Sequence, residues 1–521
     1  MIKDFNFLFN YLEKIEIAID KSEFVFQMQS HPDFPSLLSI VDTLSFFNID
    51  NVVVHVKFSD IPLLPNRFIT LLTEDNREPE LTLIQRIENR YFVEERINTV
   101  EILLSDLESR WNGICHLIEK TQTETGKGKK NKTYIIMGIL SLFTFLFLLF
   151  FINISNVLKL FLLLPVAGIL FSIAALKDLF GVKNEIINKF CNMIPTSSCG
   201  SLIGSKKWKI FKFINFSDLS MIFFVAQFLG FMFMMIAGDI STFFVIQQMF
   251  LYFCIPIILL SLYYQNYVEK KWCPICLIII LIILLESGFV IMEANFYFKF
   301  SFQSLSILCF VNTITILIWL SIKSIFIKQK ELKEEQLKSN RFQRNYEIFK
   351  NTLVAKKSVQ LPYTPFVLGN GKSNKIITII TNPYCKHCAS VHEIICKILH
   401  KFRNEIQIQI IFKIDLEFYE KESLNFLKIL IQQFLNNGGL KFEEVLTYWF
   451  DKNDTNLWMK KYKIEIQAMQ INEIYTNQNN WCNANGFNYT PALFINGYEY
   501  PKTFNRDNLE YYINDLIDDN F

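Results

Sequence analysis

The sequence predicts a multi-domain protein in which a helical transmembrane bundle of about six spans separates two soluble α/β domains. Half of the residues (51%) are hydrophobic and 53 are phenylalanine, which is unusual for a soluble protein. Strand-like patterns occur before residue 125 and after residue 355. Between them lie six apolar stretches, each about the 20 residues that a helix needs to cross the hydrocarbon core, at 134–154, 157–176, 219–237, 241–267, 274–292 and 304–322.

Residues 1–125 are expected to form the first soluble domain. Apolar residues recur at helical spacing in two segments of this region, the second being 36–44. Four segments that are rich in β-branched and aromatic residues predict strands, at 51–56, 67–72, 80–84 and 90–93. The first 20 residues carry several charges and no long apolar core, so we expect no cleavable signal peptide.

The order and spacing of this region, centred on His31-Pro32-Asp33-Phe34-Pro35, resemble the peptidase domain of bacteriocin-exporting transporters, which has a papain-like fold. That family needs a nucleophilic cysteine near its N-terminus and a histidine on a later strand. Here no cysteine precedes Cys115, and no histidine lies between His55 and His116. The resemblance therefore implies an inactive papain-like domain without peptidase activity, which could bind peptides or serve as a docking module.

Residues 133–328 contain the predicted membrane domain, which follows a lysine-rich linker. If the spans alternate in direction, the loop 191–199, the start of the span 274–292 and both soluble domains lie on one side. Most loop lysines lie on that side too, and the positive-inside rule assigns such a side to the cytoplasm. Redox chemistry argues for the opposite side, because stable protein disulfides form mainly outside the cytoplasm. We expect the outside, although the lysine distribution argues against it.

Residues 323–345 are charged and helical in composition and are predicted to continue the last span into solvent, and 329–354 is predicted to be a helical linker. A second soluble α/β domain is then expected at 355–521. Its strand patterns lie at 375–381 and 406–412, and helical patterns fill roughly 420–480 as an insertion.

A C-x-x-C motif follows the first of these strands and opens a helix, a context that is typical of redox-active pairs. Cys385 would lie at the helix N-terminus, where the dipole and the free N–H groups favour its thiolate. Cys388 lies one turn later and is expected to be the buried resolving thiol. No second C-x-x-C and no histidine pair follows at a zinc-like spacing, so we expect a redox pair and no metal site.

The strand, the C-x-x-C motif, the helix and a later Asn-Tyr-Thr-Pro sequence together resemble the thioredoxin fold with a helical insertion, as in periplasmic disulfide oxidoreductases. In that family a Thr-Pro pair before the next strand has a cis peptide bond that faces the dithiol, where the substrate backbone pairs. Thr490 and Pro491 match this pattern. The resemblance implies that these two residues bind substrate.

The eleven cysteines fall into groups. Cys273 and Cys276 form a second C-x-x-C motif at the start of an apolar span, and Cys191 and Cys199 are separated by seven residues in the preceding loop. The remaining cysteines outside these pairs are expected to be buried apolar residues, namely Cys115, Cys254, Cys309, Cys396 and Cys482.

A loop cysteine pair, a basic amphipathic stretch, two spans and then Trp-Cys-Pro-Ile-Cys resemble the vitamin K epoxide reductase family, which in bacteria is often fused to a thioredoxin domain. The resemblance implies that Cys276 faces a quinone ring and that Cys273 exchanges with Cys199. It also implies that Cys191 accepts electrons from the thioredoxin-like dithiol. Ser201 is a candidate quinone-binding residue.

We therefore predict a membrane thiol:quinone oxidoreductase that forms disulfides in exported polypeptides, with ubiquinone or menaquinone as its cofactor. Its predicted location is the bacterial inner (cytoplasmic) membrane, as a multi-pass protein with periplasmic soluble domains. Expected partners are membrane lipid, thiol-containing exported proteins and, as a further candidate, a peptide exporter. The formal net charge of +2 does not suggest nucleic acid. Two alternatives stay open, a transmembrane supply of thiol reductant and an accessory role in peptide export.

Glu286 lies ten residues behind Cys276 in the same apolar span. An ionisable residue at that depth is a functional hypothesis, here proton handling during quinone reduction. The rise of the helix places it about 15 Å from Cys276, so pairing with Gln247, Gln248 or Asn312 is an equal alternative.

Overall fold

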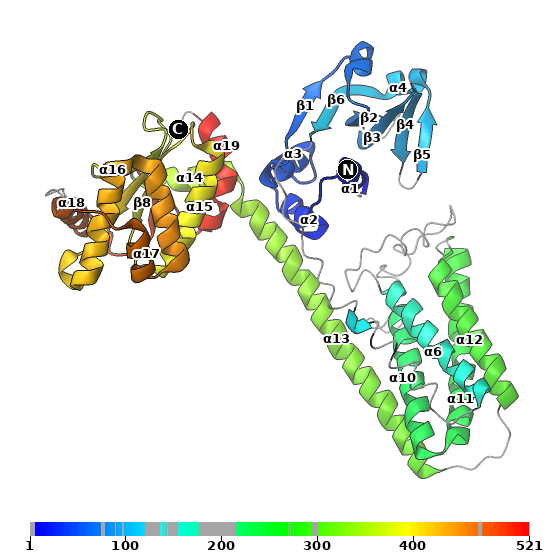
Figure 1. Cartoon of the computed structure of the whole chain (residues 1–521). Coiled ribbons are helices and arrows are strands. Elements are labelled where there is room, and N and C mark those ends of the chain that lie inside the picture. Colours follow the sequence, from blue (N-terminus) through cyan, green and yellow to red (C-terminus); the bar gives the residue numbers. More distant parts are fainter. Residues whose placement is uncertain are drawn as a thin grey trace.

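The structure, a computed structural model, contains a β-sheet domain, a bundle of apolar helices and a C-terminal α/β domain (Figure 1). It describes residues 6–73, 79–88, 90–95, 98–119, 136–138, 140, 143, 155–176, 215–268, 270, 272–293, 301–466 and 471–519. Cys191, Cys199 and Ser201 lie outside the described residues, as does most of the first predicted span.

The N-terminal domain packs three helices against a six-stranded antiparallel sheet with strand order β1-β6-β2-β3-β4-β5. An apolar cluster between the helices and the sheet forms its main core. Its elements are α1 (Asn6–Lys14), α2 (Lys21–Gln29), α3 (Leu37–Phe46), β1 (Asn51–His55), β2 (Arg67–Leu72), β3 (Glu80–Ile87), β4 (Arg90–Glu95), β5 (Asn98–Ile102), α4 (Leu104–Arg110) and β6 (Trp111–Ile118). All four predicted strands are present.

Cys115 and His116 are neighbours on β6, so their side chains point to opposite faces of the sheet and cannot form a Cys–His pair. Burial raises the pKa of the Cys115 thiol to about 11, and burial lowers the pKa of His116 to about 4. The thiol lies near the hydroxyl of Thr70, and the His116 ring contacts the amide oxygen of Asn51 at 3.0 Å. These two residues therefore do not form a thiol-protease dyad.

Within the described residues, five helices are long and apolar enough to cross a membrane. They are α6 (Asn156–Ala175), α10 (Phe216–Ala237), α11 (Ile240–Tyr263, continued to Val268 by a π-helical turn), α12 (Pro274–Glu293) and the first half of α13 (Phe302–Gln343). Hydrogen bonds show that their directions alternate. Ser172 near the end of α6 meets Ser220 near the start of α10, and Asp239 before α11 meets Ser304 at the start of α13.

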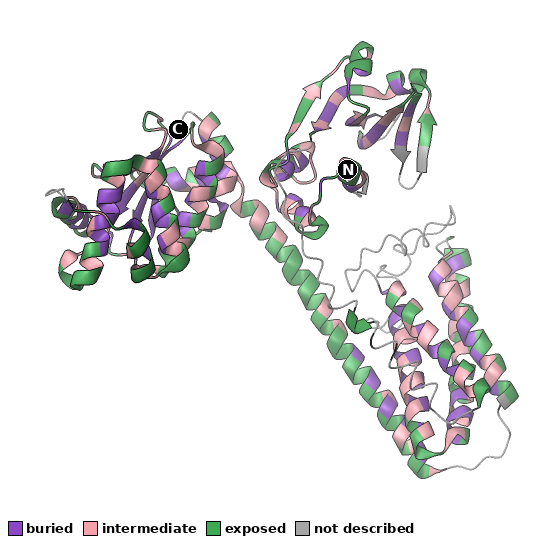
Figure 2. Cartoon of the chain, viewed as in Figure 1, coloured by how far each residue is buried: buried purple, intermediate pink, exposed green. Residues whose placement is uncertain are grey.

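Aromatic rings fill the centre of the bundle. Phe161 of α6 lies 4.9 Å from Phe289 of α12 and 5.3 Å from Phe244 of α11, measured between ring centroids. Gly168 allows α6 to approach α10, because an added Cβ would lie 2.4 Å from the ring of Phe224. The outward faces stay apolar and exposed (Figure 2), as lipid-facing surfaces are.

A buried ion pair lies at the end of the bundle where α10 begins. Asp218 of α10 is 1% exposed, and one of its carboxylate oxygens accepts a hydrogen bond from Lys323 of α13 at 2.5 Å. Trp319, one turn earlier on α13, donates its indole N–H to the other oxygen at 3.2 Å. The carboxylate therefore ties α10 to α13 where the latter leaves the bundle.

Replacement of Asp218 by asparagine, or of Lys323 by methionine, is expected to destabilise the bundle by about 3–5 kcal/mol, because each leaves the partner charge buried without compensation. The double variant is expected to recover most of this loss. Thermal unfolding of the three variants in detergent measures the effect. Equal and additive losses would contradict a coupled pair.

The C-terminal domain has a five-stranded sheet with strand order β11-β10-β8-β9-β7, in which β8 and β9 are parallel and the other pairs are antiparallel. Helices cover both faces (Figure 1). Its elements are α14 (Tyr346–Val354), β7 (Val367–Gly369), β8 (Ile376–Thr381), α15 (Lys386–Phe402), β9 (Gln407–Phe412), α16 (Lys421–Lys452), α17 (Thr455–Tyr462), α18 (Ile471–Ala484), β10 (Ala492–Ile495), β11 (Tyr498–Glu499) and α19 (Leu509–Asp518).

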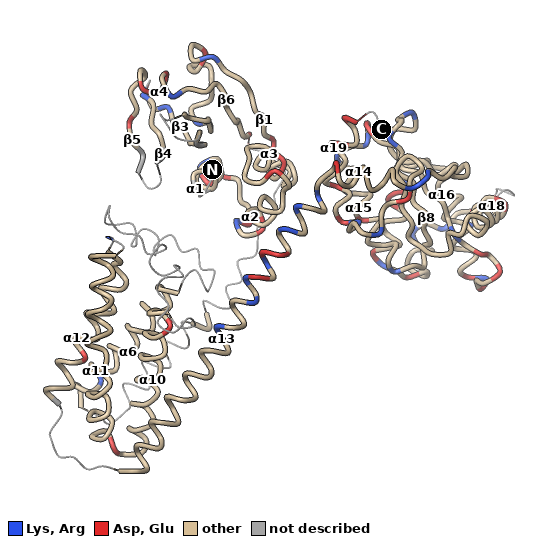
Figure 3. Tube along the Cα trace, turned by 180° about the vertical axis from the view of Figure 1, so that it is seen from behind, with Lys and Arg blue, Asp and Glu red and all other residues tan. Residues whose placement is uncertain are grey.

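The predicted linker 329–354 consists of two different parts. Up to Gln343 it continues α13 as an exposed helix, and the charged residues of α13 other than Lys323 lie beyond the bundle (Figures 2 and 3). From Tyr346 it is α14, which packs in the core of the C-terminal domain, with Phe349 stacked on Tyr512 at 4.0 Å between ring centroids. The chain breaks helical geometry between them, at Arg344 and Asn345.

Candidate functional site

The C-terminal dithiol lies where the central strand β8 passes into α15. The Asn382 side chain holds the intervening turn, because its oxygen accepts the N–H of Tyr384 at 2.9 Å and its amide donates to the carbonyl of Lys413 at 3.0 Å. Cys385 is the N-cap residue of α15, and Cys388 lies in the first turn. The turn therefore presents Cys385 at the positive end of the helix.

The two thiols have different environments. Partial burial acts to raise the pKa of Cys385, but hydrogen bonds from Thr490, Cys388 and the first backbone N–H groups of α15 outweigh it, and the pKa is lowered. Burial raises the pKa of Cys388 to about 11, and only 1% of its surface is exposed. Cys385 is thus suited to attack, and Cys388 to a later resolving step.

The Thr490–Pro491 peptide bond is cis, and it lies beside the dithiol. The carbonyl oxygen of Thr490 is 3.5 Å from the Sγ of Cys385. Pro491 leads directly into β10, which pairs with β8, so the sheet fixes both sides of this contact. Fold and geometry thus bring together four of the residues singled out in the sequence.

Alkylation is expected to distinguish the two thiols by pH, because the thiolate is the reactive form. Cys385, with its lowered pKa, should react first at pH 7, and Cys388 should react appreciably only as the pH approaches about 11. Mass spectrometry of iodoacetamide-treated reduced protein measures both sites. A Cys388→Ser variant is the control, and preferential labelling of Cys388 at pH 7 would contradict the assignment.

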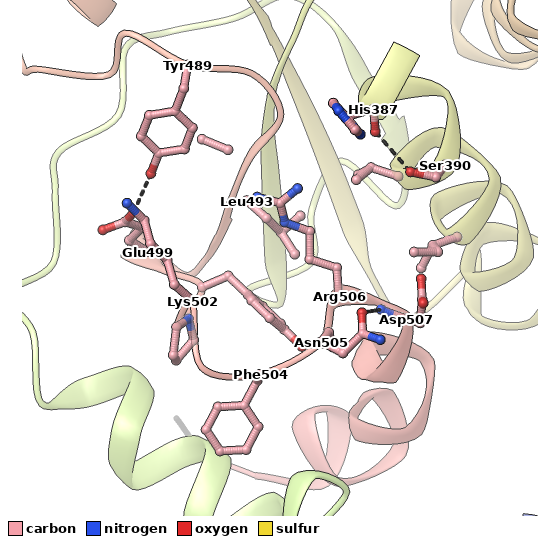
Figure 4. A pocket seen from close by; sticks show the side chains of 15 residues that line it. His387, Ser390, Tyr489, Leu493, Glu499, Lys502, Phe504, Asn505, Arg506 and Asp507 are labelled. Carbon is pink, nitrogen blue, oxygen red and sulfur yellow. Dashed lines mark hydrogen bonds between the residues drawn. The ribbon is translucent and has the colours of Figure 1, made fainter. Parts of the chain in front are cut away.

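A cavity of about 510 Å³ lies against the start of α15 and the segment that follows Tyr489 (Figure 4). His387, between the two cysteines, forms part of its wall, and Tyr489 before Thr490 forms another. Apolar residues such as Leu493 and Phe504 line its base, and Arg506 extends across it in Figure 4. Such a volume is typical of ligand pockets.

The second C-x-x-C motif lies at the N-terminus of α12. Cys273 is fully buried, and its backbone N–H donates to the side-chain oxygen of Gln265 at 3.0 Å. Gln265 belongs to a π-helical turn at the end of α11 and also contacts Ser261. Cys276, one turn into α12, is half-buried. Gln265 was not singled out in the sequence, although a glutamine that ends an apolar stretch is a usable signal.

The described residues do not bring the two dithiols together. Between Lys323 at the mouth of the bundle and the end of α13 the helix rises about 30 Å, and the C-terminal domain begins beyond it. The loop pair that was predicted to connect them, Cys191 and Cys199, lies outside the described residues.

Glu286 is fully buried, and neither of its carboxylate oxygens has a hydrogen-bond partner among the described residues. Of its predicted partners, Gln248 donates to Tyr252 and Asn312 donates to the carbonyl of Leu308. The amide nitrogen of Gln247 has no hydrogen-bond partner in this part of the chain either. The predicted pairing of Glu286 with Gln247, Gln248 or Asn312 is therefore not present among the described residues.

Of the five lone cysteines, Cys309 differs from expectation because it is exposed. It lies on α13 in the membrane-spanning half, where an apolar residue can face lipid as well as the core. Cys115 and Cys482 are buried, and Cys254 and Cys396 are half-buried.

The C-terminal domain is similar to known thioredoxin-like proteins. A family model described as Thioredoxin matches residues 362–515. Similar solved structures include oxidised BdbD from Bacillus subtilis, with 13% identity and a TM-score of 0.26, covering 32% of this chain and 100% of that one. ScsC from Proteus mirabilis has 14% identity and a TM-score of 0.25, covering 38% and 94%. The thiol-disulfide exchange protein α-DsbA2 from Wolbachia pipientis has 15% identity and a TM-score of 0.24, covering 34% and 97%.

No curated protein matches the chain. The family match and the dithiol geometry agree on the C-terminal domain, and a thioredoxin-like dithiol of this kind indicates thiol–disulfide oxidoreductase chemistry. The chain is a multi-domain protein with an N-terminal sheet domain, several apolar helices compatible with membrane spans, and a C-terminal thioredoxin-like domain.

Proposed function

We propose that this protein is a quinone-dependent thiol oxidase that forms disulfides in exported polypeptides. Electrons pass from substrate thiols to Cys385 and Cys388, then through the loop pair Cys191 and Cys199, then to the pair that opens α12, and finally to a membrane quinone. The observation that carries this proposal is a dithiol with a lowered pKa on Cys385, in a chain whose other C-x-x-C motif opens an apolar helix.

The first exchange needs the disulfide form of the soluble pair. A substrate thiolate attacks the sulfur of Cys385, and the Cys388 sulfur leaves as a thiolate and takes up a proton. The second thiolate of the substrate then attacks the substrate sulfur that is bonded to Cys385, and the Cys385 thiolate leaves. The substrate has lost two electrons and formed a disulfide, and the soluble pair is a dithiol. The lowered pKa of Cys385 makes it a good leaving group in this second step.

The residues around Cys276 fit a quinone by their chemistry. Cys276 is half-buried and packs on the apolar core of the bundle, next to Ile275 and Ile279, which suits a hydrophobic ring with an isoprenoid tail. When bound, ubiquinone or menaquinone would take up the two electrons and two protons that the dithiol releases. Cys273 is buried, and its N–H donates to Gln265, so it has no contact with lipid. In this proposal Cys273 exchanges with the loop pair. Ser201 remains a candidate for the same pocket.

The cavity at the start of α15 supports a polypeptide as the substrate. Its apolar base can accept side chains next to a reacting cysteine, and its rim carries both charge signs. The carboxylate of Glu499 is already engaged by Tyr489 and Lys356. Arg506 has no ion pair among the described residues, so it can meet an acidic group of the substrate.

The resemblance to the vitamin K epoxide reductase family supports the quinone step, and disulfide formation supports a bacterial inner membrane with both soluble domains outside. Both domains join the same end of the bundle, because α13 carries one and contacts the other. The papain-like resemblance supports peptide binding by the N-terminal domain, which is the basis for a role beside a peptide exporter.

The decisive test uses the purified full chain in detergent with a reduced cysteine peptide and a ubiquinone or menaquinone analogue. We expect quinone absorbance to fall as one quinol forms for each disulfide, because each step moves two electrons. Disulfide exchange without quinone reduction would overturn the oxidase. Reduction of peptide disulfides with quinol as the donor would instead support a supply of thiol reductant.

A further inference from the structure

The joint between the membrane helix and the thioredoxin-like domain is short. α13 ends at Gln343, and Asn345 already caps α14, with its side chain accepting the N–H of Ile348 at 3.0 Å. α14 belongs to the core of the thioredoxin-like domain, so the joint lies at Arg344 and Asn345. Beyond the bundle α13 is exposed along most of its length (Figure 2). The thioredoxin-like domain also contacts the last turn of α13 directly, because Asn508 and Tyr512 donate to Gln343 and Phe342 stacks on Phe504. These contacts all lie at the joint itself, so contacts farther from it are needed to fix the orientation of the dithiol domain at the end of such an arm.

The N-terminal domain contacts this joint through the last turn of α13. The last carbonyls of α2 lie at the negative end of the helix dipole, which favours cations, although that of Gln27 also accepts the N–H of Ser30 at 3.1 Å. Arg341 donates to the carbonyl of Gln29 at 2.7 Å, and Arg344 donates to the carbonyl of Gln27 at 3.4 Å. One turn of α13 is thereby fixed against the C-terminal end of α2.

The same surface of the N-terminal domain also contacts the thioredoxin-like domain beyond the joint. Phe46 of α3 stacks on Tyr511 of α19 with ring centroids 5.3 Å apart and planes 9° apart. The Tyr511 hydroxyl donates to the side chain of Gln27 at 2.8 Å, and Lys401 at the end of α15 lies over the Phe46 ring at 5.7 Å. The guanidinium of Arg344 lies over the Tyr511 ring, 3.9 Å from its centroid.

We infer that the N-terminal domain is a docking module for this joint, and that the C-terminal end of α2 together with α3 is the docking surface. Because the surface holds residues on both sides of the joint, it prevents the joint from bending and fixes the orientation of the dithiol domain. The docking leaves the redox face free, since Lys401 and Cys385 lie at opposite ends of α15, about 24 Å apart. The N-terminal domain is thus a positioning element and not part of the redox site.

Fluorescence energy transfer in the full chain tests the docking directly. Donor and acceptor dyes attached to non-natural residues at Leu63 and Tyr363, which are 85% and 89% exposed, report the relative position of the two domains. We expect one narrow population in the parent protein and a broad distribution in the Arg341→Ala/Arg344→Ala variant. Phe46→Ala removes the stacking on Tyr511 from the N-terminal domain's side of the interface. It is also expected to broaden the distribution of dye distances. The matched control, Lys333→Ala/Lys338→Ala, removes the same charge from exposed positions of α13 and is expected to keep the narrow population.

A redox measurement separates positioning from simple stability. Exchange between a small soluble dithiol and Cys385 should stay within twofold in all variants, because the redox face is not touched. Oxidation of the reduced soluble pair by the membrane domain should fall on the order of tenfold in the docking variants, because a domain with many orientations spends less time with its dithiol at the acceptor, which lowers the effective concentration. A narrow distribution in both docking variants overturns the docking, whatever the redox result. A broad distribution with unchanged oxidation overturns the positioning role.

Discussion

Replacement of Cys385 by serine is expected to lower thiol oxidation by on the order of 10³-fold or more, because a serine hydroxyl cannot form the thiolate that carries the exchange. The structure singles out this sulfur by three features. It caps α15, its pKa is lowered, and its Sγ lies 3.5 Å from the carbonyl of Thr490 beside the cis peptide. Oxidation of a fluorescent cysteine peptide by the full chain measures the loss.

Two further variants complete this experiment. Cys388→Ser should also lose oxidation of reduced peptide, because Cys385 alone cannot form the disulfide that the substrate thiolate attacks. Incubated with a peptide disulfide instead, this variant should accumulate mixed disulfides at Cys385, which non-reducing gels reveal, because the thiol that would expel the peptide is missing. Cys396→Ser is the matched control on the same helix, where the thiol contacts His392 and Thr447 and has a raised pKa, caused mainly by burial. Full activity of Cys385→Ser, or loss of activity in the Cys396 control, would contradict the assignment.

Replacement of Cys276 by serine should abolish quinone reduction and leave exchange at the soluble dithiol intact. The physical reason is separation, because Cys276 lies at the mouth of the bundle and the soluble pair lies beyond an arm of about 30 Å. Exchange requires sulfur atoms to touch, so each pair can fail independently. Quinol formation and disulfide exchange with a soluble dithiol, measured on the same preparation, give the two rates.

Cys309→Ser is a suitable control for this second experiment, since Cys309 also lies on a membrane helix but is exposed on the outside of the bundle. Its quinol formation should match that of the parent protein. If Cys276→Ser retained quinone reduction, the membrane pair would be excluded from the electron path. If Cys276→Ser also lost exchange at the soluble pair, the two dithiols would not react independently as proposed above.

Local patterns were sufficient for most secondary structure. The β-branched and aromatic composition of 67–72 predicted β2 with its observed ends, and the continuous apolar run before Cys385 predicted a strand that is buried on both faces. The dithiol position followed in the same way, since a strand, a turn and a helix are defined by neighbours in the chain. Tyr346–Val354 is the counterexample. It was included in the predicted linker 329–354, but its apolar face packs on α19, which lies far away in sequence.

The sequence alone determined that this protein has two C-x-x-C motifs, one opening a soluble helix and one opening an apolar span, because motif, helix start and hydropathy are local properties. Only the tertiary structure decided how each cysteine is held. The contact of Cys385 with Thr490, the support of Cys273 by Gln265 and the ion pair of Asp218 with Lys323 all join distant segments. The contact of α2 with α13 is of the same kind, because Arg341 and Gln29 lie far apart in the sequence and meet only in the folded protein. Such contacts depend on packing, which has no signature within one stretch of sequence.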